Sequence, residues 1–482
     1  MSTIAAASTD RAAQLQRWGG SEALDDFETL MWRLDDRPNL RSAVVSVEIL
    51  DRVPDWERLW TAHEWAAAAT PRMRSRLLEL PPGLGNPVWK IDRDFRLDRH
   101  LRRIQLRAPG ELREVLDHAQ RLAMAPFDKR RPPWEALLIE GLQDGGAAYV
   151  LKLHHAMSDG MGIVQLLGAA HSRSREPQPR PQAATPQQQR LGETLSRQLL
   201  RRRENLAARL QDARRGVETL LTRGRDDAGQ LAIDALRYAA SLKRVLDPKS
   251  APPSPLLARR SHRWRFEAME VPLAGLKAAA KQSGATLNDA FIAGLLGGFA
   301  RYHRRFGTVP SSLPVTFPIS LRSAQDSAGG NRFVPGQFAA PLAEPDPRKR
   351  MQLISEAVTR IRREPALRAT LDLMPLLSRL PTAVVAEAMG RRIASQDLQI
   401  SNVPGLRDEV YLAGARVTQL FPFAPLPGCA GMITLVSHGD SCCIGLNLDE
   451  AAVSRPGWLM QDLQESFDEV LRLGTAAEAA HA

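Results

Sequence analysis

Cysteine is scarce in this chain: Cys429, Cys442 and Cys443 are the three among 482 residues. Three cysteines, two of them adjacent, fit neither a disulfide framework nor a structural zinc site. Because disulfides persist mainly in oxidising compartments, a reducing cytoplasm is the expected setting.

Long apolar runs are missing as well. The longest that we find, residues 290–300, is much shorter than the roughly 20 residues of a membrane-spanning helix. The N-terminal stretch contains Asp10, Arg11 and Arg17 but no apolar segment typical of a secretory signal. With 44% hydrophobic and 25% charged residues, the composition excludes a wholly disordered, collagen-like or multi-span membrane chain. At roughly 100–200 residues per domain, the length predicts two to four domains.

The excess of positive charge is concentrated in the middle of the chain. The net charge is +11, and residues 173–260 hold 19 Lys or Arg against 9 Asp or Glu. The same segment has one aromatic residue, Tyr238, whereas nucleic-acid-binding domains commonly interleave basic and aromatic side chains. Nucleic acid is therefore not an expected partner. An anionic membrane surface fits the segment better, with a solvated charged face as the simplest alternative.

The first third of the chain alternates strand-like and helix-like patterns, which indicates an α/β fold. A strand rich in β-branched residues is expected at 42–49, and helices are expected at 56–69 and 111–123. Asp144-Gly145 between two apolar runs predicts a hairpin over 136–153. Alternation along its second strand gives two faces: Tyr149, Leu151 and Leu153 on one, and Val150, Lys152 and His154 on the other.

The composition changes after His171. Residues 173–190 hold four prolines and a run of three glutamines, which predicts an extended or disordered linker. Residues 191–246 are helix-like, because leucines recur at three-, four- and seven-residue spacings with arginines largely between them. This helix either packs its leucines on the protein body or lies as an amphipathic helix on anionic lipid. The expected division is an N-terminal domain over 1–172, a basic linker over 173–260 and a C-terminal domain over 261–482.

An α/β pattern resumes in the last part of the chain. Pro272 suits the first turn of one helix, and Thr286 or Asn288 is the expected N-cap of the next. The expected elements are strands at 264–271 and 315–321, helices at 273–282, 287–301, 348–363 and 456–472, and a hairpin of 432–436 with 442–447.

The clearest chemical signal is H-H-A-M-S-D-G at residues 154–160. Histidine can accept and return a proton near neutral pH. At a strand end, His154 and His155 point to opposite sides, so one of them can face a given pocket. Asp159 can orient a ring or anchor the loop, and Gly160 permits a tight turn. The alternative is a pair of structural histidines.

Other chemistries find less support in the sequence. Asp159 is the only carboxylate close to the two histidines and no cysteine lies nearby, so no metal is expected. The chain has no G-x-S-x-G elbow, no P-loop and no G-x-G-x-x-G after a strand. A serine nucleophile or a nucleotide held by a glycine-rich loop is therefore not expected.

The histidine motif resembles the HHxxxDG signature of CoA-dependent acyltransferases. Nearly the whole chain resembles one branch of that superfamily, the bacterial wax ester synthase/diacylglycerol acyltransferases. The supporting segments are P-F-D to R-P-P-W-E at 126–135, T-L-N-D at 286–289, P-I-S-L-R with G-N at 318–331, and S-N-V-P-G at 401–405. Pro133 and Leu406 depart from the family pattern, which commonly has Leu and Pro at these places.

The resemblance implies a fold and a set of site residues. The fold is two chloramphenicol acetyltransferase-like α/β domains with mixed sheets, joined by a helical crossover linker, with the active site in a tunnel between them. His155 is the implied general base, and His154 and Asp159 are implied to be structural or orienting, with Asp159 paired to Arg322. Asn288 is the implied oxyanion donor. The implied substrate-binding residues are Gly160, Asp289 and Trp134, the last two also open to a structural role.

The implied reaction moves a long-chain acyl group from acyl-CoA to diacylglycerol or to a long-chain fatty alcohol. Acyl-CoA is a co-substrate, and no other cofactor is expected. Such substrates predict a cytoplasmic enzyme that is peripheral on the inner face of the plasma membrane or on lipid inclusions. The alternatives are a condensation or polyketide-associated acyltransferase that uses carrier-protein thioesters, and a non-catalytic lipid-surface protein.

Overall fold

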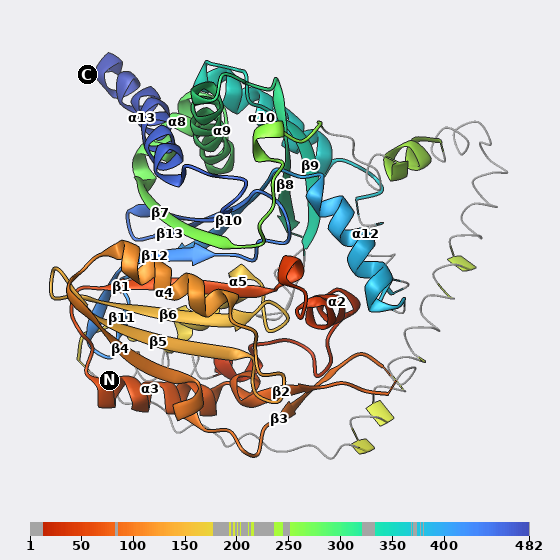
Figure 1. Cartoon of the computed structure of the whole chain (residues 1–482), viewed down its shortest axis with the longest axis vertical. Helices are drawn as coiled ribbons and strands as arrows, with labels where there is room; N and C mark the ends of the chain where they lie inside the picture. The colour runs from red at the N-terminus through yellow and green to blue at the C-terminus, as the bar shows by residue number, and fades with distance from the viewer. Residues whose placement is uncertain are drawn as a thin grey trace.

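The computed structural model describes residues 13–81, 85–176, 251–320, 333–367 and 380–481, with short pieces between 192 and 243 and between 369 and 378. Its main features are two six-stranded sheets that lie one above the other, each covered by helices (Figure 1). Both sheets mix parallel and antiparallel pairs. The expectation of two α/β units with mixed sheets is therefore confirmed.

The first sheet has the strand order β11-β12-β1-β6-β5-β4. Its β4 and β5 run parallel, and the other neighbours are antiparallel. The strands are β1 (Ala43–Leu50), β4 (Leu101–Gly110), β5 (Trp134–Leu142), β6 (Ala147–His154), β11 (Tyr411–Leu412) and β12 (Ala415–Phe423). The small pair of β2 (Ser75–Leu78) and β3 (Val88–Ile91) lies beside it.

The second sheet has the order β7-β14-β13-β10-β8-β9. Its β10 runs parallel to both of its neighbours, β8 and β13. The strands are β7 (Trp264–Pro272), β8 (Ser312–Ser320), β9 (Phe333–Pro341), β10 (Leu398–Leu406), β13 (Gly431–His438) and β14 (Ser441–Asp449).

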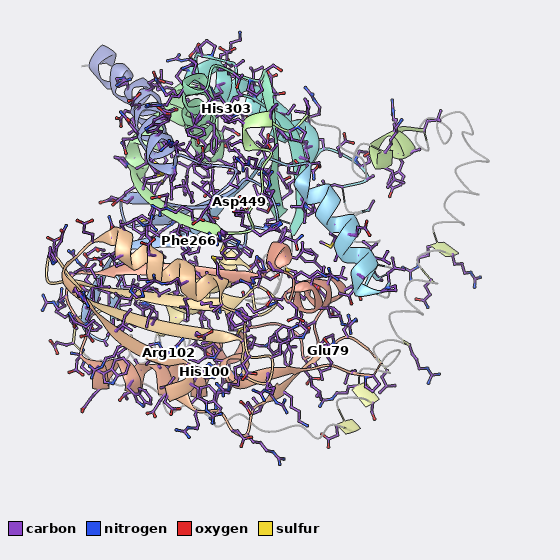
Figure 2. The ribbon with its side chains drawn as sticks, viewed as in Figure 1. Glu79, His100, Arg102, Phe266, His303 and Asp449 are labelled. Atoms are coloured by element: carbon purple, nitrogen blue, oxygen red, sulfur yellow. The ribbon has the colours of Figure 1, made fainter. Side chains whose placement is uncertain are left out.

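The two sheets are tied together by the C-terminal part of the chain. β12 leaves the second half and pairs antiparallel with β1, with Val45 opposite Phe423. Phe266 of β7, labelled in Figure 2, stacks on Phe423 with ring centroids 4.1 Å apart. A side chain at Gly445 of β14 would clash with the backbone of Pro422, so glycine permits this close approach of the sheets. The predicted division into consecutive residue ranges does not include this pairing of a C-terminal strand with the first sheet.

Helices cover the outer faces and fill the space between the sheets (Figure 1). α8, α9 and α13 pack on one another above the second sheet, α4 lies between the sheets against β7, and α12 reaches down to α2. The helices are α2 (Asp26–Leu34), α3 (Trp56–Ala69), α4 (Leu112–Met124), α5 (Gly160–Ala170), α8 (Leu273–Gln282), α9 (Leu287–Arg305), α10 (Pro347–Arg362), α12 (Thr382–Ala394) and α13 (Pro456–His481). Short 3-10 turns are η1 (Pro38–Leu40), η2 (Pro71–Arg74), η3 (Leu97–Arg99) and η4 (Pro255–Leu257).

Local signals predicted several boundaries well. The helix expected at 56–69 is α3, which starts where Asp55 accepts from the Arg58 N–H and ends before Pro71, whose ring disfavours helix in the residue before it. The helix expected at 273–282 is α8, although Pro272 is its N-cap rather than a residue of its first turn. The long helix expected at 191–246 falls largely outside the described residues.

Candidate active site

His154 is the last residue of β6 and lies inside the protein. Its side chain is 0% exposed, and its ring packs edge-on against Trp32 and Phe127, with centroids 5.1 and 5.5 Å away. Its Nδ1 accepts a hydrogen bond from the backbone N–H of Ala156 at 3.0 Å, and its carbonyl accepts from the N–H of Met157 at 2.8 Å. His154 therefore holds the turn that follows β6.

His155 follows the strand and is half-buried. Its backbone N–H donates to the carbonyl of Ser42 at 2.7 Å, which fixes the residue against the start of β1. Its ring lies 6.3 Å, centroid to centroid, from the ring of Phe333 at the start of β9. Phe333 in turn meets Phe27 of α2 edge-on at 5.7 Å. His155 thus lies where the first sheet meets a strand of the second, next to the ring of Phe333.

The end of the motif starts α5. Asp159 is the N-cap, and its Oδ1 accepts from the N–H of Gly162 at 2.9 Å. A β-carbon at Gly160 would lie 3.1 Å from a methyl group of Val403, so the first turn of α5 packs closely on β10. Val403 belongs to the S-N-V-P-G segment, and the fold brings these two motifs, distant in sequence, into contact.

The T-L-N-D segment starts α9 through a capping box. The Oγ1 of Thr286 accepts from the N–H of Asp289, and the Oδ2 of Asp289 accepts from the N–H of Thr286 at 2.9 Å and from its hydroxyl at 2.7 Å. Thr286 is therefore the N-cap, and Asp289 is 2% exposed with its carboxylate used inside the helix start. Asn288 is half-buried in the first turn. Its role as an oxyanion donor stays a prediction, as does substrate binding by Asp289.

Trp134 lies in the core at the start of β5. It is 1% exposed, its Nε1–H donates to the carbonyl of Met73 at 2.7 Å, and its ring stacks on His100 at 4.6 Å. These contacts are those of a structural residue, and a substrate-binding role stays a prediction. Arg322, the expected partner of Asp159, lies outside the described residues.

Three residues near the histidines have no counterpart in the sequence predictions. Trp32 packs on His154, Asp35 lies 3.5 Å from it, and Phe27 contacts Phe333, the aromatic neighbour of His155. All three belong to α2 or to its C-cap. The capping box of Asp25 and Glu28 is a local signal for this helix. No local signal reveals that the helix packs against His154.

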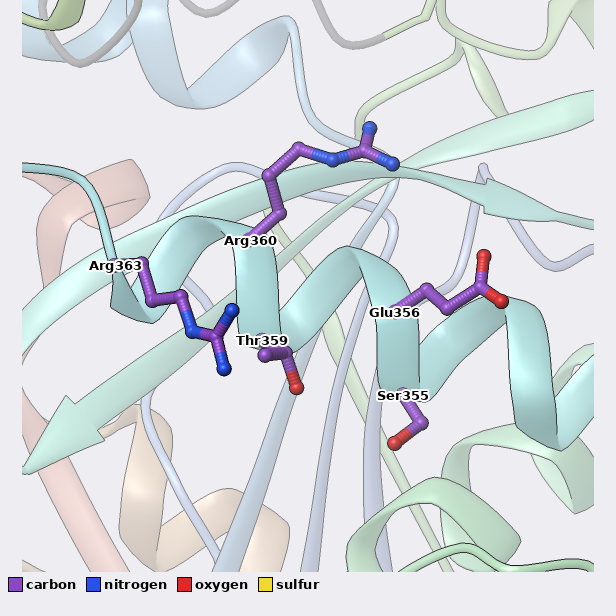
Figure 3. Close-up of a pocket in the computed structure, with 5 residues that line it drawn as sticks. All are labelled: Ser355, Glu356, Thr359, Arg360 and Arg363. Atoms are coloured by element: carbon purple, nitrogen blue, oxygen red, sulfur yellow. The ribbon is translucent and has the colours of Figure 1, made fainter.

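Two surface hollows of the described residues lie at other places than the histidines. One lies along α10 and is lined by Ser355, Glu356, Thr359, Arg360 and Arg363, which Figure 3 draws. Another lies between η1 and α12. Neither is lined by His155, and the tunnel expected there stays a prediction. Within the described residues, no helix is long and apolar enough to cross a membrane, and no group of three or more His, Cys, Asp or Glu side chains is arranged to hold a metal.

Two facing mixed sheets, with an HHxxxDG motif at the end of a central strand, define a two-lobed fold shared with acyltransferases and condensation domains. The wax ester synthase/diacylglycerol acyltransferase from Marinobacter aquaeolei VT8 superposes with a TM-score of 0.63 at 20% identity, covering 94% of this chain and 100% of that one. The first condensation domain of the calcium-dependent antibiotic synthetase gives 0.60 at 17% identity, covering 94% and 96%. At these identities the likeness concerns the fold.

The sequence comparisons identify the family. The wax ester synthase/diacylglycerol acyltransferase catalytic domain matches residues 23–291, and the WS/DGAT C-terminal domain matches 329–471. A Mycobacterium tuberculosis H37Rv protein, provisionally named a diacylglycerol O-acyltransferase, is 39% identical over 458 residues, 94% of this chain and 92% of the relative. A second such protein of that strain is 28% identical over 477 residues, 94% and 98% of the two chains. The chain belongs to the wax ester synthase/diacylglycerol acyltransferase family, as its motifs predicted.

Proposed function

We propose that the protein transfers a long-chain acyl group from acyl-CoA to an alcohol oxygen. The acceptor is diacylglycerol, which gives a triacylglycerol, or a long-chain fatty alcohol, which gives a wax ester. The observation that carries the proposal is the half-buried His155, fixed by its backbone to Ser42 between the two sheets of a chain of this family. The relatives' provisional name favours diacylglycerol as acceptor.

The proposed mechanism uses His155 as general base. Its imidazole removes the acceptor's hydroxyl proton while that oxygen attacks the thioester carbon, because an alcohol is too weak an acid to ionise alone. The tetrahedral intermediate expels the CoA thiolate, which receives the proton back from His155. The side-chain amide of Asn288 is the proposed donor to the developing oxyanion. Acyl-CoA is the co-substrate, and no further cofactor is proposed.

A direct assay tests the reaction. Purified protein is incubated with palmitoyl-CoA and either dioleoylglycerol or hexadecanol, and neutral lipids are separated by thin-layer chromatography. Because a positioned base contributes about 10²–10⁴-fold, H155A should lose transfer by that factor and stay folded. H118A, which replaces the half-buried His118 of α4, is the matched control and should keep wild-type rates.

Three outcomes would redirect the assignment. Near-wild-type transfer by H155A would contradict the mechanism. Turnover of a carrier-protein thioester with little use of free acyl-CoA would support the condensation-type alternative. Lipid binding without turnover of any thioester, unchanged in H155A, would support a non-catalytic lipid-surface protein.

We also propose that the enzyme is peripheral, on the inner face of the plasma membrane or on lipid inclusions. The support is chemical: the proposed substrates reside in or on lipid, and the basic linker at 173–260 suits an anionic surface.

A further inference from the structure

We propose that Asp35 is a positioning residue for the acyl transfer, acting on both histidines of the motif from the end of α2. The proposal rests on the proposed role of His155 as general base. Asp35 lies outside all of the motifs that identified the family, and its part in the site emerges from three-dimensional contacts alone.

Asp35 is the C-cap of α2 and is 5% exposed. Its Oδ1 accepts a hydrogen bond from the backbone N–H of Ser42 at 2.7 Å. The same oxygen lies 3.5 Å from the Nε2 of His154, a distance of electrostatic contact rather than of a short hydrogen bond. One carboxylate therefore touches both the chain entering β1 and the histidine ending β6.

The route to His155 runs through Ser42. The N–H of Ser42 is held by Asp35, and its carbonyl accepts from the N–H of His155 at 2.7 Å. Ser42 can shift only if one of these two short hydrogen bonds lengthens. Asp35 thus restrains the backbone that sets the direction of the proposed base.

The second route is the tautomer of His154. Because Nδ1 accepts from the N–H of Ala156, that nitrogen carries no proton, and neutral His154 carries its proton on Nε2. Nε2 lies 3.5 Å from the Asp35 carboxylate, and the negative charge at that distance favours this tautomer over the other. If the His154 ring flipped or took up a second proton, its hydrogen bond with the N–H of Ala156 would break. The turn that contains His155 would then be less firmly held.

Charges around Asp35 keep it ionised. Burial raises the pKa of Asp35, but the contact with His154 and the hydrogen bond from Ser42 lower it more, so that it lies below the ordinary value. Lys129 adds a favourable positive charge. Lys152 lies on the same face of β6 as His154. Its ammonium group donates to the carbonyl of Ala125 at 2.8 Å and to the carboxylate of Glu135 at 3.2 Å.

The test compares D35N with D36N. Asn keeps an oxygen for the Ser42 N–H but removes the negative charge that faces His154. Asp36 is the adjacent carboxylate, with a side chain 72% exposed and paired to Lys129 at 2.7 Å, so D36N removes an equal charge while the contacts of Asp35 with Ser42 and His154 stay in place. Steady-state kinetics with palmitoyl-CoA and dioleoylglycerol are measured from pH 5 to 9, together with the melting temperature.

The expected result for D35N is a kcat lower by about 10–100-fold, because small misplacements of a catalytic group have effects of this size. KM for both substrates should change little. The acidic limb of the kcat profile should move to lower pH, since D35N removes a negative charge that is linked to His155 through the two hydrogen bonds of Ser42, and this loss makes His155 easier to deprotonate. D35E, which keeps the charge but displaces it, should retain the position of that limb while losing part of kcat. D36N should match wild type in every measurement.

The proposal is overturned if D35N folds and keeps both the kcat and the pH profile of D36N. If D35N does not fold, D35E decides: a kcat equal to that of D36N overturns the proposal, and a lower kcat at unchanged KM supports it. H155A is assayed in parallel. Full activity of H155A would overturn the proposed function itself, which separates the two failures.

Discussion

At the scale of single residues, adjacent histidines of one motif have different surroundings. His154 is enclosed by Trp32 and Phe127 and used by the backbone of Ala156, whereas His155 is half-buried and faces Phe333. The two-residue period of a strand is the cause, because neighbouring side chains leave it in opposite directions. One histidine therefore supports the turn, and the other lies between the sheets, where we propose that it acts as the general base.

Asp159 offers a residue-scale prediction. D159A should lower the free energy of unfolding by about 0.5–2 kcal/mol, because it removes the acceptor for the N–H of Gly162 at the start of α5. D159N should lose much less, since Asn caps helices about as well as Asp. Urea unfolding of the three proteins measures the difference. Equal losses in D159A and D159N would show that the charge of Asp159, rather than its cap, stabilises the protein.

At the scale of elements, the site depends on two elements that carry no catalytic group. α2 brings Trp32 and Asp35 to His154, and β10 brings Val403 to Gly160 at the first turn of α5. Gly405 in β10 allows the strand to approach the backbone of Ser437, where any side chain would clash. The S-N-V-P-G segment is thus explained in part by packing.

Asp397 gives a prediction for the start of β10. It is 0% exposed, and its Oδ2 accepts from the N–H of Ser254 at 2.8 Å. Burial raises the pKa of Asp397, whereas the hydrogen bond from Ser254 and the nearby charge of Arg260 lower it. The effect of burial is larger, and the pKa rises from 3.8 to about 6. The folded state therefore holds this proton more tightly than the unfolded state, and its contribution to stability is lost as pH rises through about 6.

D397N stays neutral at every pH, so it should gain stability relative to wild type between pH 5 and pH 8. The gain between these two pH values should be about 1.4 kcal/mol, because about one pH unit of the interval between 3.8 and about 6 lies above pH 5. Urea unfolding at both pH values measures it. D408N, at an exposed carboxylate, is the control and should show no such gain. A constant difference between D397N and wild type across this range would contradict the assignment.

At the scale of the whole molecule, the two halves of the chain share a sheet. β12 comes from the C-terminal part and pairs with β1, and Phe266 and Phe423 stack between the lobes. The surfaces that enclose His155 therefore come from both halves, since Phe333 lies on β9 and Ser42 precedes β1. The division into 1–172, 173–260 and 261–482 stays a prediction. The structure adds that β12, from the C-terminal range, belongs to the first sheet.

The charged linker yields a prediction about membrane binding. Each basic residue near an anionic surface contributes about 1 kcal/mol, screened over roughly 8–10 Å. Replacing five linker arginines by Gln should weaken binding to phosphatidylglycerol-containing vesicles and leave phosphatidylcholine vesicles unaffected, as measured by co-sedimentation. The five are Arg201, Arg202, Arg203, Arg214 and Arg215.

The control replaces five exposed arginines of the folded domain and so removes an equal charge. They are Arg52, Arg96, Arg102, Arg103 and Arg130. Activity on a dispersed short-chain alcohol should change little in either variant. Unchanged vesicle binding by the linker variant, at low and high salt alike, would leave the segment as a structural connection only.

The sequence by itself determined the local features of this protein. Helix-like patterns predicted α3 and α8, alternation predicted the two faces of β6, and the motif at 154–160 with its companion segments predicted the family. The helices and the two strand faces depend on residues within one or two turns of each other, so neighbours in sequence suffice to specify them. The choice between Thr286 and Asn288 as N-cap was left open, because both residue types cap well.

Only the tertiary structure decided which distant segments meet at the histidines. Four pairs of neighbours show this: Asp35 beside His154, Phe333 beside His155, Val403 beside Gly160, and β12 beside β1. Local periodicity predicts a helix or strand in each of these segments, but it does not predict which segment packs against which. An apolar face in the sequence predicts that this face is buried, but it does not predict which element covers it. The partner is selected by packing of the whole chain, because only one arrangement closes both sheets and satisfies the polar groups between them.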